Sequence, residues 1–312
     1  MIKPPFPVYP ELTSEKVILR QLRHDEVREL LSISYYDGEK TTTEAEALEM
    51  LQRIELDYQK GETIHWGIEE RKSGALTGTC GFYRGFRNAS WELGCIMRSE
   101  FQRKGYMTTA LRLATGFGFK LGLTRVFAET SNSNFAAVGL MTGLFFDQIK
   151  VEDTAVTFEL LREDLYSIRA YKSSDQYKVL SLLRSNTPDF FHPSEEKDLL
   201  SYLENEVQQY FVAEGLGTIL GAGGINYGFE GGTAARISWD MVHPEFQGLG
   251  IGKKLTSMRI KEIMKNPEIK KIEVRTTSQA EKFYHEMGFK KVFFAKDFWA
   301  PGFDLCTMQM CI

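Results

Sequence analysis

The protein has 312 residues, a length that predicts two domains of about 150 residues each. Hydrophobic residues make up 43% and charged residues 26% of the chain, which is typical of globular proteins and excludes collagen-like or disordered compositions. With 38 Lys and Arg against 42 Asp and Glu, the net charge is −4, so no positive field exists to hold a nucleic-acid backbone. We therefore expect no nucleic-acid partner.

The apolar segments are too short to span a membrane. The longest, residues 136–146, is interrupted by Thr142 and falls short of the roughly 18 to 20 residues that cross a bilayer. The start, Met-Ile-Lys-Pro-Pro-Phe-Pro, has a charge and prolines where a secretory signal needs a continuous apolar run of about 7 to 15 residues. We expect a cytoplasmic protein with no membrane partner.

The cysteines are spaced without any Cys-x-x-Cys pair. Cys80, Cys95, Cys306 and Cys311 each lie in a strand-like run, where a buried thiol packs as a small hydrophobe. This pattern favours reduced, buried cysteines over a zinc site or a disulfide. We expect no metal cofactor.

The first half of the chain begins with a predicted strand at residues 17–22. A repetitive acidic stretch from Glu39 to Asp57 is typical of the solvated face of a helix. Residues 91–97 read as a strand that leads into Gln102-Arg-Lys-Gly105. The order predicted here is a strand, one or two amphipathic helices, further strands and a glycine turn.

The second half shows the same order of elements. The expected ranges are strand 166–170, helices 171–184 and 197–209, strands 210–214, 219–227 and 235–242, helix 255–264, strand 272–274 and helix 279–287. Strands mixed with helices at these lengths predict an α/β fold built on a mixed sheet.

Three landmarks repeat in the same order in both halves. Arg20 matches Arg169, Gln102-x-x-Gly105 matches Gln247-x-x-Gly250, and Phe145-Phe146 matches Gly288-Phe289. The simplest account is a duplicated unit of roughly 145 to 150 residues. We therefore expect two domains, residues 1–163 and 164–312, with no flexible linker between them.

The strongest local signal is a strand, a glycine turn and a helix start, Val242-His-Pro-Glu-Phe-Gln247-Gly-Leu-Gly250-Ile-Gly252-Lys-Lys-Leu255. Glycines let consecutive N–H groups point into one concavity at the positive end of a helix, which suits a pyrophosphate. A Walker loop is excluded, because Gln247 and Lys254 occupy the positions of its first glycine and its hydroxyl residue. A dinucleotide fingerprint is a weak match, because His243-Pro-Glu-Phe-Gln247 separates the strand from the glycines.

The remaining pattern, Gln/Arg-x-x-Gly-x-Gly/Ala after a strand ending in Val-x-Pro, resembles the coenzyme A loop of the GNAT acetyltransferase superfamily. Gln247, Gly250 and Gly252 fill its three defined positions. Downstream, Phe283-Tyr-His-Glu-Met-Gly-Phe289 resembles the aromatic-Tyr-x-x-x-Gly-Phe signature of the family's fourth helix. The resemblance implies two tandem GNAT domains that use acetyl-CoA as a co-substrate.

The first half resembles the RimJ/RimL-like branch of this superfamily through Trp91-Glu-Leu-Gly-Cys-Ile-Met97 and Gln102-Arg-Lys-Gly105-Tyr-Met-Thr108. It departs from that branch at Met107 in place of a small residue, at Ala137 in place of a serine, and at Phe145 in place of a glycine. We therefore expect a degenerate first domain. The coenzyme contacts that the resemblance implies there are Gln102, Gly105, Tyr106 and Met107.

In the second half, the resemblance implies that main-chain N–H groups hold the coenzyme. Those of Met241 and Val242 would bind the thioester carbonyl, where preorganised donors stabilise the developing oxyanion. The pyrophosphate would lie on Gln247, Gly248, Leu249, Gly250, Ile251, Gly252 and Lys253.

The resemblance also implies a catalytic acid, because Tyr284 matches the tyrosine that protonates the departing thiolate in this family. Counting back from the phenylalanine that ends the helix, the same position in the first half is Met141, which has no proton to give. The expected turnover is therefore in the second domain.

The catalytic base is less defined by the sequence. Arg236, Ser238 and Asp240 alternate with apolar residues, so strand periodicity predicts that they share a face toward the cleft. Asp240 is our candidate base, since desolvation there would raise the pKa of its carboxyl. A structural or solvated aspartate is the alternative role for Asp240, and His243 and Glu273 are alternative bases.

An aromatic loop, Asp297-Phe-Trp-Ala-Pro-Gly-Phe-Asp304, falls between the last two expected strands, in a region that commonly shapes the acceptor pocket of this fold. Trp299 and Phe303 are candidate walls for an apolar or cationic acceptor, with Asp297 or Asp304 countering its ammonium. Core packing is the alternative role for these aromatic rings.

Two functions follow. The first is an acetyl-CoA-dependent N-acetyltransferase that acts on a primary amine of a small molecule or peptide by direct attack, without a covalent enzyme intermediate. The alternative is a non-catalytic acyl-CoA-binding sensor or scaffold module, motivated by the degenerate first half. The sequence names neither the amine nor the oligomeric state.

Overall fold

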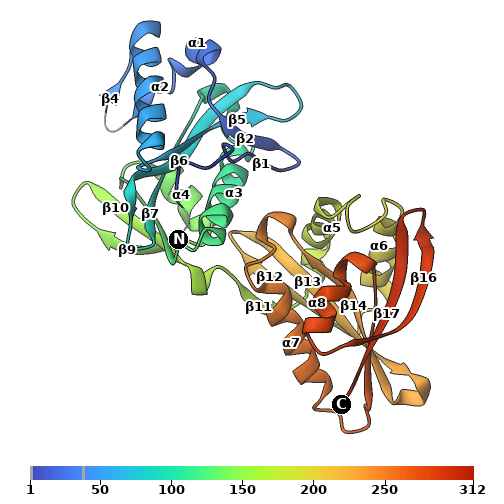
Figure 1. The fold of residues 1–312 in the computed structure, drawn as a ribbon. Coiled ribbons are helices and arrows are strands. Elements are labelled where there is room, and N and C mark those ends of the chain that lie inside the picture. The colour runs from blue at the N-terminus through green and yellow to red at the C-terminus, as the bar shows by residue number, and fades with distance from the viewer. Residues whose placement is uncertain (1–2, 37–38) are drawn as a thin grey trace. The chain divides into compact units, whose positions relative to one another are not determined.

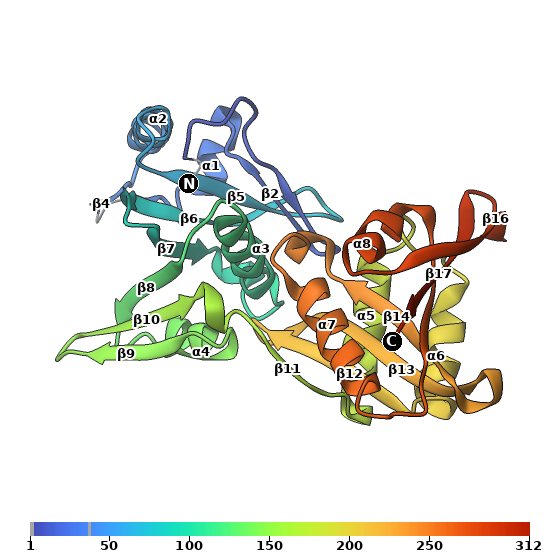
Figure 2. The same cartoon turned by 60° about the horizontal axis from the view of Figure 1, so that its bottom comes forward.

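The computed structural model describes residues 3–36 and 39–312, and it divides into two compact units, Met1–Leu165 and Tyr166–Ile312 (Figure 1). This division falls close to the boundary expected after residue 163. Each unit is a mixed sheet with helices on both faces (Figures 1 and 2), which confirms the predicted α/β class. In the part of the chain that the structure describes, no helix is long and apolar enough to cross a membrane.

Unit 1 is built on an eight-stranded sheet in the order β1-β2-β5-β6-β7-β8-β10-β9, in which only β7 and β8 run parallel. The strands of this sheet are β1 (Leu12–Thr13), β2 (Val17–Gln21), β5 (Ile64–Glu70), β6 (Leu76–Arg87), β7 (Ser90–Met97), β8 (Arg125–Ser131), β9 (Asp147–Val151) and β10 (Ala155–Leu161). Strands β3 (Tyr35–Tyr36) and β4 (Glu39–Lys40) pair with each other in a separate two-stranded sheet. Its helices are α1 (Val27–Leu30), α2 (Glu44–Gln59), α3 (Tyr106–Lys120) and α4 (Phe135–Gly143).

Unit 2 repeats this plan on a seven-stranded sheet in the order β11-β12-β13-β14-β15-β17-β16, in which only β14 and β15 run parallel. Its strands are β11 (Ser167–Ala170), β12 (Gln209–Gly215), β13 (Thr218–Phe229), β14 (Ala234–Val242), β15 (Lys271–Thr276), β16 (Lys290–Ala300) and β17 (Phe303–Cys311). Its helices are α5 (Gln176–Ser185), α6 (Glu195–Asn205), α7 (Ile251–Ile263) and α8 (Glu281–Glu286).

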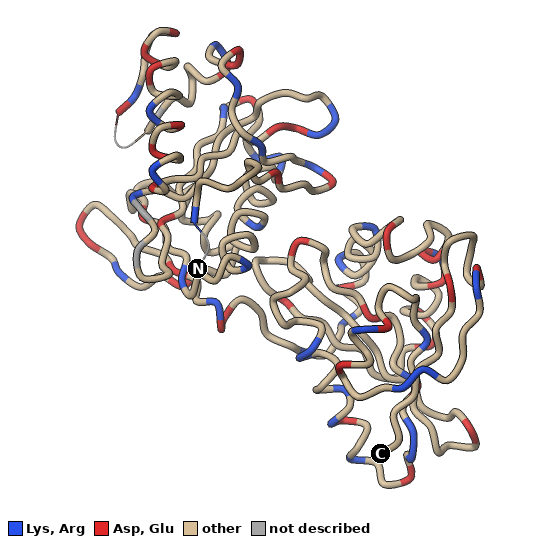
Figure 3. Tube along the Cα trace, in the orientation of Figure 1, with Lys and Arg blue, Asp and Glu red and all other residues tan. Residues whose placement is uncertain are grey.

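The acidic stretch of unit 1 is mostly the amphipathic helix α2. Its start is fixed by a capping box in which the Thr43 side chain accepts from Glu46 N at 3.2 Å, while the Glu46 carboxylate accepts from Thr43 N at 3.2 Å. Ala47, Leu51 and Ile54 are buried on one side of the helix. The acids lie on the other side, as the sequence predicted. Charged residues of both signs are interspersed over both units (Figure 3).

Helix α7 begins four residues earlier than the expected start at residue 255. Gly250 adopts a left-handed conformation, with φ 86° and ψ −2°, and acts as the N-cap, so Gly252 lies in the first helical turn. Two nearby glycines predict a loop in a sequence, but here Gly250 alone lies outside the helix. Helix α6 ends at Asn205, before the expected end at residue 209, because residue 209 is already the first residue of β12.

The sheet of unit 2 separates two apolar cores. On the face covered by α5 and α6, Leu183 and Leu199 pack with Met241 of β14. On the face covered by α7 and α8, Ile263 and Tyr284 pack with Ile237. These two sides are called the α5–α6 face and the α7–α8 face below.

The four cysteines are free thiols. Cys80 and Cys306 are buried, as expected, and Cys80 lies opposite Cys95 in the β6–β7 pair. The expectation of burial was wrong for Cys311, which is exposed because it ends β17 next to the last residue.

Candidate functional site

The glycine turn of unit 2 joins the end of β14 to the start of α7. Gly248 and Gly250 have φ of 80° and 86°, the left-handed region that favours glycine. A Cβ at either residue would meet no described atom within 4 Å, so open space lies on that side. No described side chain caps the 13-residue helix α7, which leaves its first-turn N–H groups available to an anion.

The predicted loop residues form one turn, which two buried side chains and one hydrogen bond hold in place. Leu249 and Ile251 are buried, and Gln247 Nε2 donates to Val242 O at 3.3 Å. Gly252 has room for a methyl group, since its Cβ would lie 3.4 Å from a Val242 methyl carbon. Lys253 is exposed. The turn thus presents its backbone outward, as the fit of a pyrophosphate requires.

Beside this turn, β14 and β15 separate. Their parallel pairing runs only from Ala234 opposite Lys271 to Ile237 opposite Val274. Past that point β14 has a β-bulge at Trp239, whose φ is 53°, so Gly223 of β13 faces two residues of β14 instead of one. The unpaired end of β14 therefore borders a gap in the sheet.

Backbone alternation decides which N–H group faces this gap. His243 N donates to Leu220 O at 2.9 Å across the β13–β14 pair. Because alternate residues of an antiparallel strand point to the same neighbour, the N–H of Met241 also faces β13, and that of Val242 points away from it. Of the two donors expected from the sequence, only Val242 is oriented toward the gap.

The bulge also corrects the predicted strand face. Ile237 and Asp240 both point to the α7–α8 face, because the extra residue at Trp239 reverses the alternation. Arg236 lies on the other face, where its Nη2 donates to Glu273 Oε1 at 2.6 Å. The expectation that Arg236, Ser238 and Asp240 share a face was therefore wrong.

Asp240 joins two partners from different helices. Its Oδ2 accepts from the Tyr284 hydroxyl of α8, and its Oδ1 accepts from Nη1 of Arg259 of α7. Arg259 is 1% exposed and the Asp240 side chain 22% exposed. A Cβ at Gly223 would overlap both Asp240 and Arg259, so only glycine fits beneath this chain of contacts.

The guanidinium is held in place by further hydrogen bonds. Arg259 donates to Leu255 O at 3.2 Å, to Gly224 O at 3.3 Å and to the Thr256 hydroxyl at 3.2 Å. Arg259 was not predicted from the sequence as a site residue. A signal exists, since Arg259 falls four residues after Leu255 and four before Ile263, in an otherwise apolar stripe of α7.

Burial sets the protonation of this group. It raises the pKa of the Tyr284 phenol well above its usual value, the Asp240 charge raises it further, and Arg259 opposes the shift. Burial alone would lower the pKa of Arg259, but the Asp240 charge and hydrogen bond raise it overall. Tyr284 therefore keeps its proton at neutral pH, beside an ionised Arg259.

Unit 1 has the same turn in a different setting. Arg103 and Gly105 have φ of 61° and 80°, and Gly105 is the N-cap of the 15-residue helix α3. Gln102 and Met107 flank this turn, and the Tyr106 hydroxyl donates to Glu70. Arg103 holds a left-handed conformation without being glycine, which costs about 1 kcal/mol or more.

The Asp240–Arg259–Tyr284 chain has no counterpart in unit 1. Counting from the two capping glycines, Cys95 stands for Asp240 and Ala114 for Arg259. Counting back from the phenylalanines that follow α4 and α8, Met141 stands for Tyr284. Ala114 and Met141 are buried. Strand β7 pairs regularly with β6 from Leu93 to Met97, without a bulge. All three polar groups are replaced together.

On the α5–α6 face of unit 2, the Trp239 ring of β14 stacks on Phe191 with centroids 6.2 Å apart. From the aromatic loop, the Phe303 ring lies edge-on to His192 at 5.8 Å. Asp297 and Asp304, expected to counter an ammonium, hold the hairpin turn instead. Asp304 accepts from Asp297 N at 3.0 Å and from the Ser278 hydroxyl at 3.1 Å, and Asp297 accepts from Gly302 N at 2.6 Å.

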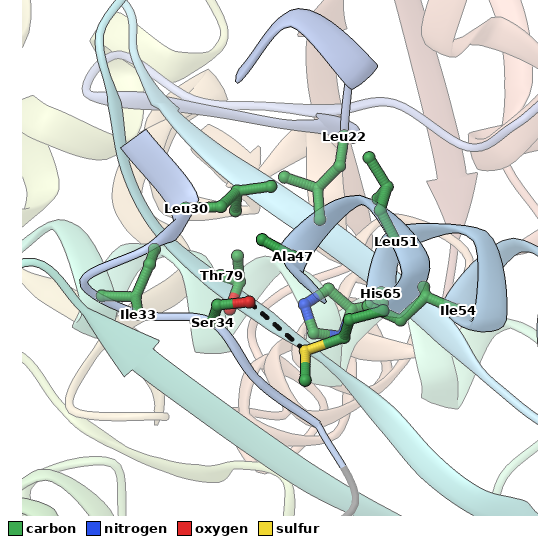
Figure 4. Close-up of a pocket in the computed structure, with 10 residues that line it drawn as sticks. Leu22, Leu30, Ile33, Ser34, Ala47, Leu51, Ile54, His65 and Thr79 are labelled. Atoms are coloured by element: carbon green, nitrogen blue, oxygen red, sulfur yellow. Dashed lines mark hydrogen bonds between the residues drawn. The ribbon is translucent and has the colours of Figure 1, made fainter. Parts of the chain in front are cut away.

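Two hollows lie elsewhere, in unit 1. Figure 4 shows one of about 20 Å³ between α1, α2 and the sheet, with Ser34, His65 and Thr79 among apolar side chains. This volume holds about one water molecule. A second of about 550 Å³ shares His65 and three of the apolar residues with it. Neither hollow includes a residue of the glycine turns, so we do not assign the coenzyme to them.

Residues 3–36 and 39–312 contain no group of three or more His, Cys, Asp or Glu side chains that could hold a metal ion.

The turn, the strand gap and the uncapped N-terminus of α7 together leave backbone N–H groups of unit 2 open to an anionic ligand. Both units match family models described as acetyltransferase (GNAT) domain, over residues 16–147 and 181–312. The chain belongs to the GNAT acetyltransferase family, as two domains in tandem, which confirms the predicted family. It is an N-acetyltransferase of a family that uses acetyl-CoA.

Individual relatives match about half of the chain. The uncharacterized N-acetyltransferase YoaA of Bacillus subtilis (strain 168) is 27% identical over 150 residues, which cover 45% of this chain and 85% of that protein. A proposed ribosomal-protein-serine acetyltransferase from Vibrio cholerae is 22% identical with a TM-score of 0.45, covering 51% of this chain and 99% of that one. A RimL acetyltransferase in complex with coenzyme A is 16% identical with a TM-score of 0.43, covering 49% and 98%.

Proposed function

We propose that unit 2 transfers an acetyl group from acetyl-CoA to a primary amine of a small molecule or peptide by direct attack, and that unit 1 keeps a coenzyme loop without turnover. The observation that carries this proposal is the buried contact of Tyr284 and Arg259 with Asp240, set against Cys95 and Met141 in unit 1. If a duplication left one catalytic copy, both units should keep the backbone of the glycine turn, and only one should keep the polar side chains beside it.

Backbone N–H groups bind the coenzyme in this proposal. Those from Gln247 to Lys253, at the positive end of α7, hold the pyrophosphate. Bound acetyl-CoA supplies the thioester that the amine attacks. The Val242 N–H, turned into the strand gap, donates to the thioester carbonyl and stabilises the oxyanion that forms there.

Tyr284 is the proposed acid. As the carbon–nitrogen bond forms and the carbon–sulfur bond breaks, the Tyr284 hydroxyl gives its proton to the sulfur that leaves. Its raised pKa keeps it protonated until then. Asp240 orients the hydroxyl and Arg259 balances the negative charge that appears on the phenol. Asp240, first considered as the base, is thus a positioning residue in this proposal.

The acceptor enters from the α5–α6 face, because the loop and α7 occupy the other side of the gap. Glu273 is the candidate base that lies on this face, with its side chain 16% exposed and bonded to Arg236 and Gln309. We assign it the proton that the attacking amine loses. His243 is turned to its own loop, where its Nδ1 accepts from Glu245 N at 3.3 Å.

Thiol release from acetyl-CoA with a panel of small primary amines and short peptides tests the proposal. The expected result is amine-dependent release that Tyr284→Phe reduces, with coenzyme affinity, measured by calorimetry, nearly unchanged. Tight coenzyme binding without release by any amine would contradict it and favour the sensor or scaffold alternative.

A further inference from the structure

The α5–α6 face of the unit 2 sheet carries a cation, Arg275, that forms no ion pair with a described carboxylate. Ile272 and Val274 of β15 are buried in the α7–α8 core, so strand alternation places Glu273 and Arg275 on the opposite face. Both side chains therefore lie on the side from which the acceptor enters in the proposed function. Arg275 is the first residue of β15 after the last residue that pairs with β14.

Glu273, the carboxylate on the same face of β15 as Arg275, already accepts hydrogen bonds from two other side chains. Glu273 Oε1 accepts from Arg236, and its Oε2 accepts from Gln309 Nε2 at 3.0 Å. Arg275, by contrast, makes no ion pair or hydrogen bond through its guanidinium with any residue that the structure describes. Burial lowers the pKa of Arg275 most, the nearby charge of Arg236 lowers it further, and the charge of Glu273 opposes both effects.

The aromatic loop fixes where this guanidinium lies. Its central carbon is 5.2 Å from the ring centroid of Phe298 and 4.9 Å from that of Trp299. Of the two rings predicted to wall an apolar or cationic acceptor, Trp299 is therefore already in contact with a cation, whereas Phe303 lies against His192. Asp297 and Asp304, the expected counter-charges, are bound within the hairpin turn.

Stacking leaves the edge of a guanidinium free. Its N–H groups lie in the plane of the ion, so rings that contact its face do not use them. A planar group of negative charge that accepts two parallel hydrogen bonds fits this edge, and a carboxylate has that geometry. An ammonium would be repelled by Arg275 and by Arg236.

We propose that Arg275 binds a carboxylate of the acceptor, so that the substrates of unit 2 are amines that also carry a carboxylate, such as amino acids or short peptides with a free carboxyl end. This inference rests on the proposed function of unit 2. Arg275 acts in it as a specificity-determining residue, held in place by Phe298 and Trp299.

Matched acceptors test the inference: 4-aminobutanoate with 4-aminobutanamide, and triglycine with triglycine amide. Thiol release should give a kcat/KM about tenfold or more higher for the carboxylate of each pair, mainly through KM. Arg275→Gln should remove this preference and leave the amides within about twofold. Arg275→Lys should keep part of it, because the charge remains without the planar fork.

Calorimetric titration of the coenzyme A-bound protein with the same pairs separates this inference from the proposed function. Tighter binding of the carboxylates that is lost in Arg275→Gln supports the inference even if no amine is acetylated, in which case the proposed function fails. Equal binding and equal rates within both pairs, or equal losses for both members in Arg275→Gln, overturn it. Lys265→Gln is the matched control, since it removes one exposed charge that pairs with Glu262 at the end of α7.

Discussion

The two glycine turns of this protein have nearly the same backbone and different surroundings. Arg103 and Gly105 in unit 1 repeat the left-handed conformations of Gly248 and Gly250 in unit 2, each pair just before a long helix. Yet among the described residues, the chain of contacts formed by Asp240, Arg259 and Tyr284 occurs in unit 2, and unit 1 has Cys95, Ala114 and Met141 in its place. The difference teaches that the backbone of a glycine turn and the buried polar side chains beside it are separable features of one fold.

Their separation has an energetic reason. A backbone turn depends on a few torsion angles, and it persists even where Arg103 makes one of them costly. A buried charge needs its partner, because an unpaired one costs several kcal/mol. Losing one member of the Asp240–Arg259–Tyr284 chain therefore favours losing the others, as Cys95, Ala114 and Met141 illustrate.

The largest expected effect is on turnover. Tyr284→Phe should lower kcat by about 10² to 10⁴, since a positioned acid contributes roughly that factor. KM for acetyl-CoA should stay within about twofold, as the loop is untouched. Steady-state kinetics measures this, with Met141→Leu as the control that should leave kcat unchanged. Activity that survives Tyr284→Phe but disappears in Gly105→Val would place catalysis in unit 1.

Coenzyme binding should distinguish the two turns next. Gly250→Val forces a β-branched residue to φ near 86° and fills the open side of the turn, so affinity of unit 2 for coenzyme A should fall about 10- to 100-fold. Gly105→Val should leave turnover unchanged. Calorimetry on folded variants decides, and an unchanged affinity in Gly250→Val would refute the loop assignment.

Stability should show that the polar chain acts as one unit. Arg259→Ala leaves Asp240 without its guanidinium and should cost about 3 kcal/mol of unfolding free energy. The triple variant Asp240→Cys, Arg259→Ala, Tyr284→Met, which copies unit 1, should be inactive but more stable than Arg259→Ala alone. Urea denaturation compares them. A triple variant less stable than the single one would contradict this coupling.

The smallest expected effect distinguishes the units by pH. Burial lowers the pKa of His65 in unit 1 from 6.5 to about 4. Between those values the unfolded chain binds a proton that folded unit 1 does not, so stability falls as the pH falls through this window. From pH 7 to 5 unit 1 should lose about 2 kcal/mol.

Scanning calorimetry at both pH values measures that loss. The transition of unit 1 is identified as the one that shifts in His65→Gln, which should flatten its pH dependence. A unit 1 transition that stays equally sensitive to pH in His65→Gln would assign the effect to another group.

The strand and helix order of both units could be predicted from the sequence, and so could the site of the loop. The turn from Gln247 to Gly250 depends on a few consecutive residues of chain, so local spacing carries its signal. The errors were equally local in origin. The helix start at Ile251 was missed because Gly252 reads as loop, and the strand face was wrong because a bulge at Trp239 leaves no mark in periodicity.

The sequence by itself determined the duplication, the α/β class, the GNAT family and the absence of a hydroxyl at Met141, because each depends on residue order or on one residue type. Only the tertiary structure decided the partners of Asp240 and the surroundings of Arg275. Arg259, Tyr284 and Asp240 come from three elements, and Trp299 reaches Arg275 from a different strand. Side-chain electrostatics depends on distance in space and on exclusion of water, and neither is encoded in sequence spacing.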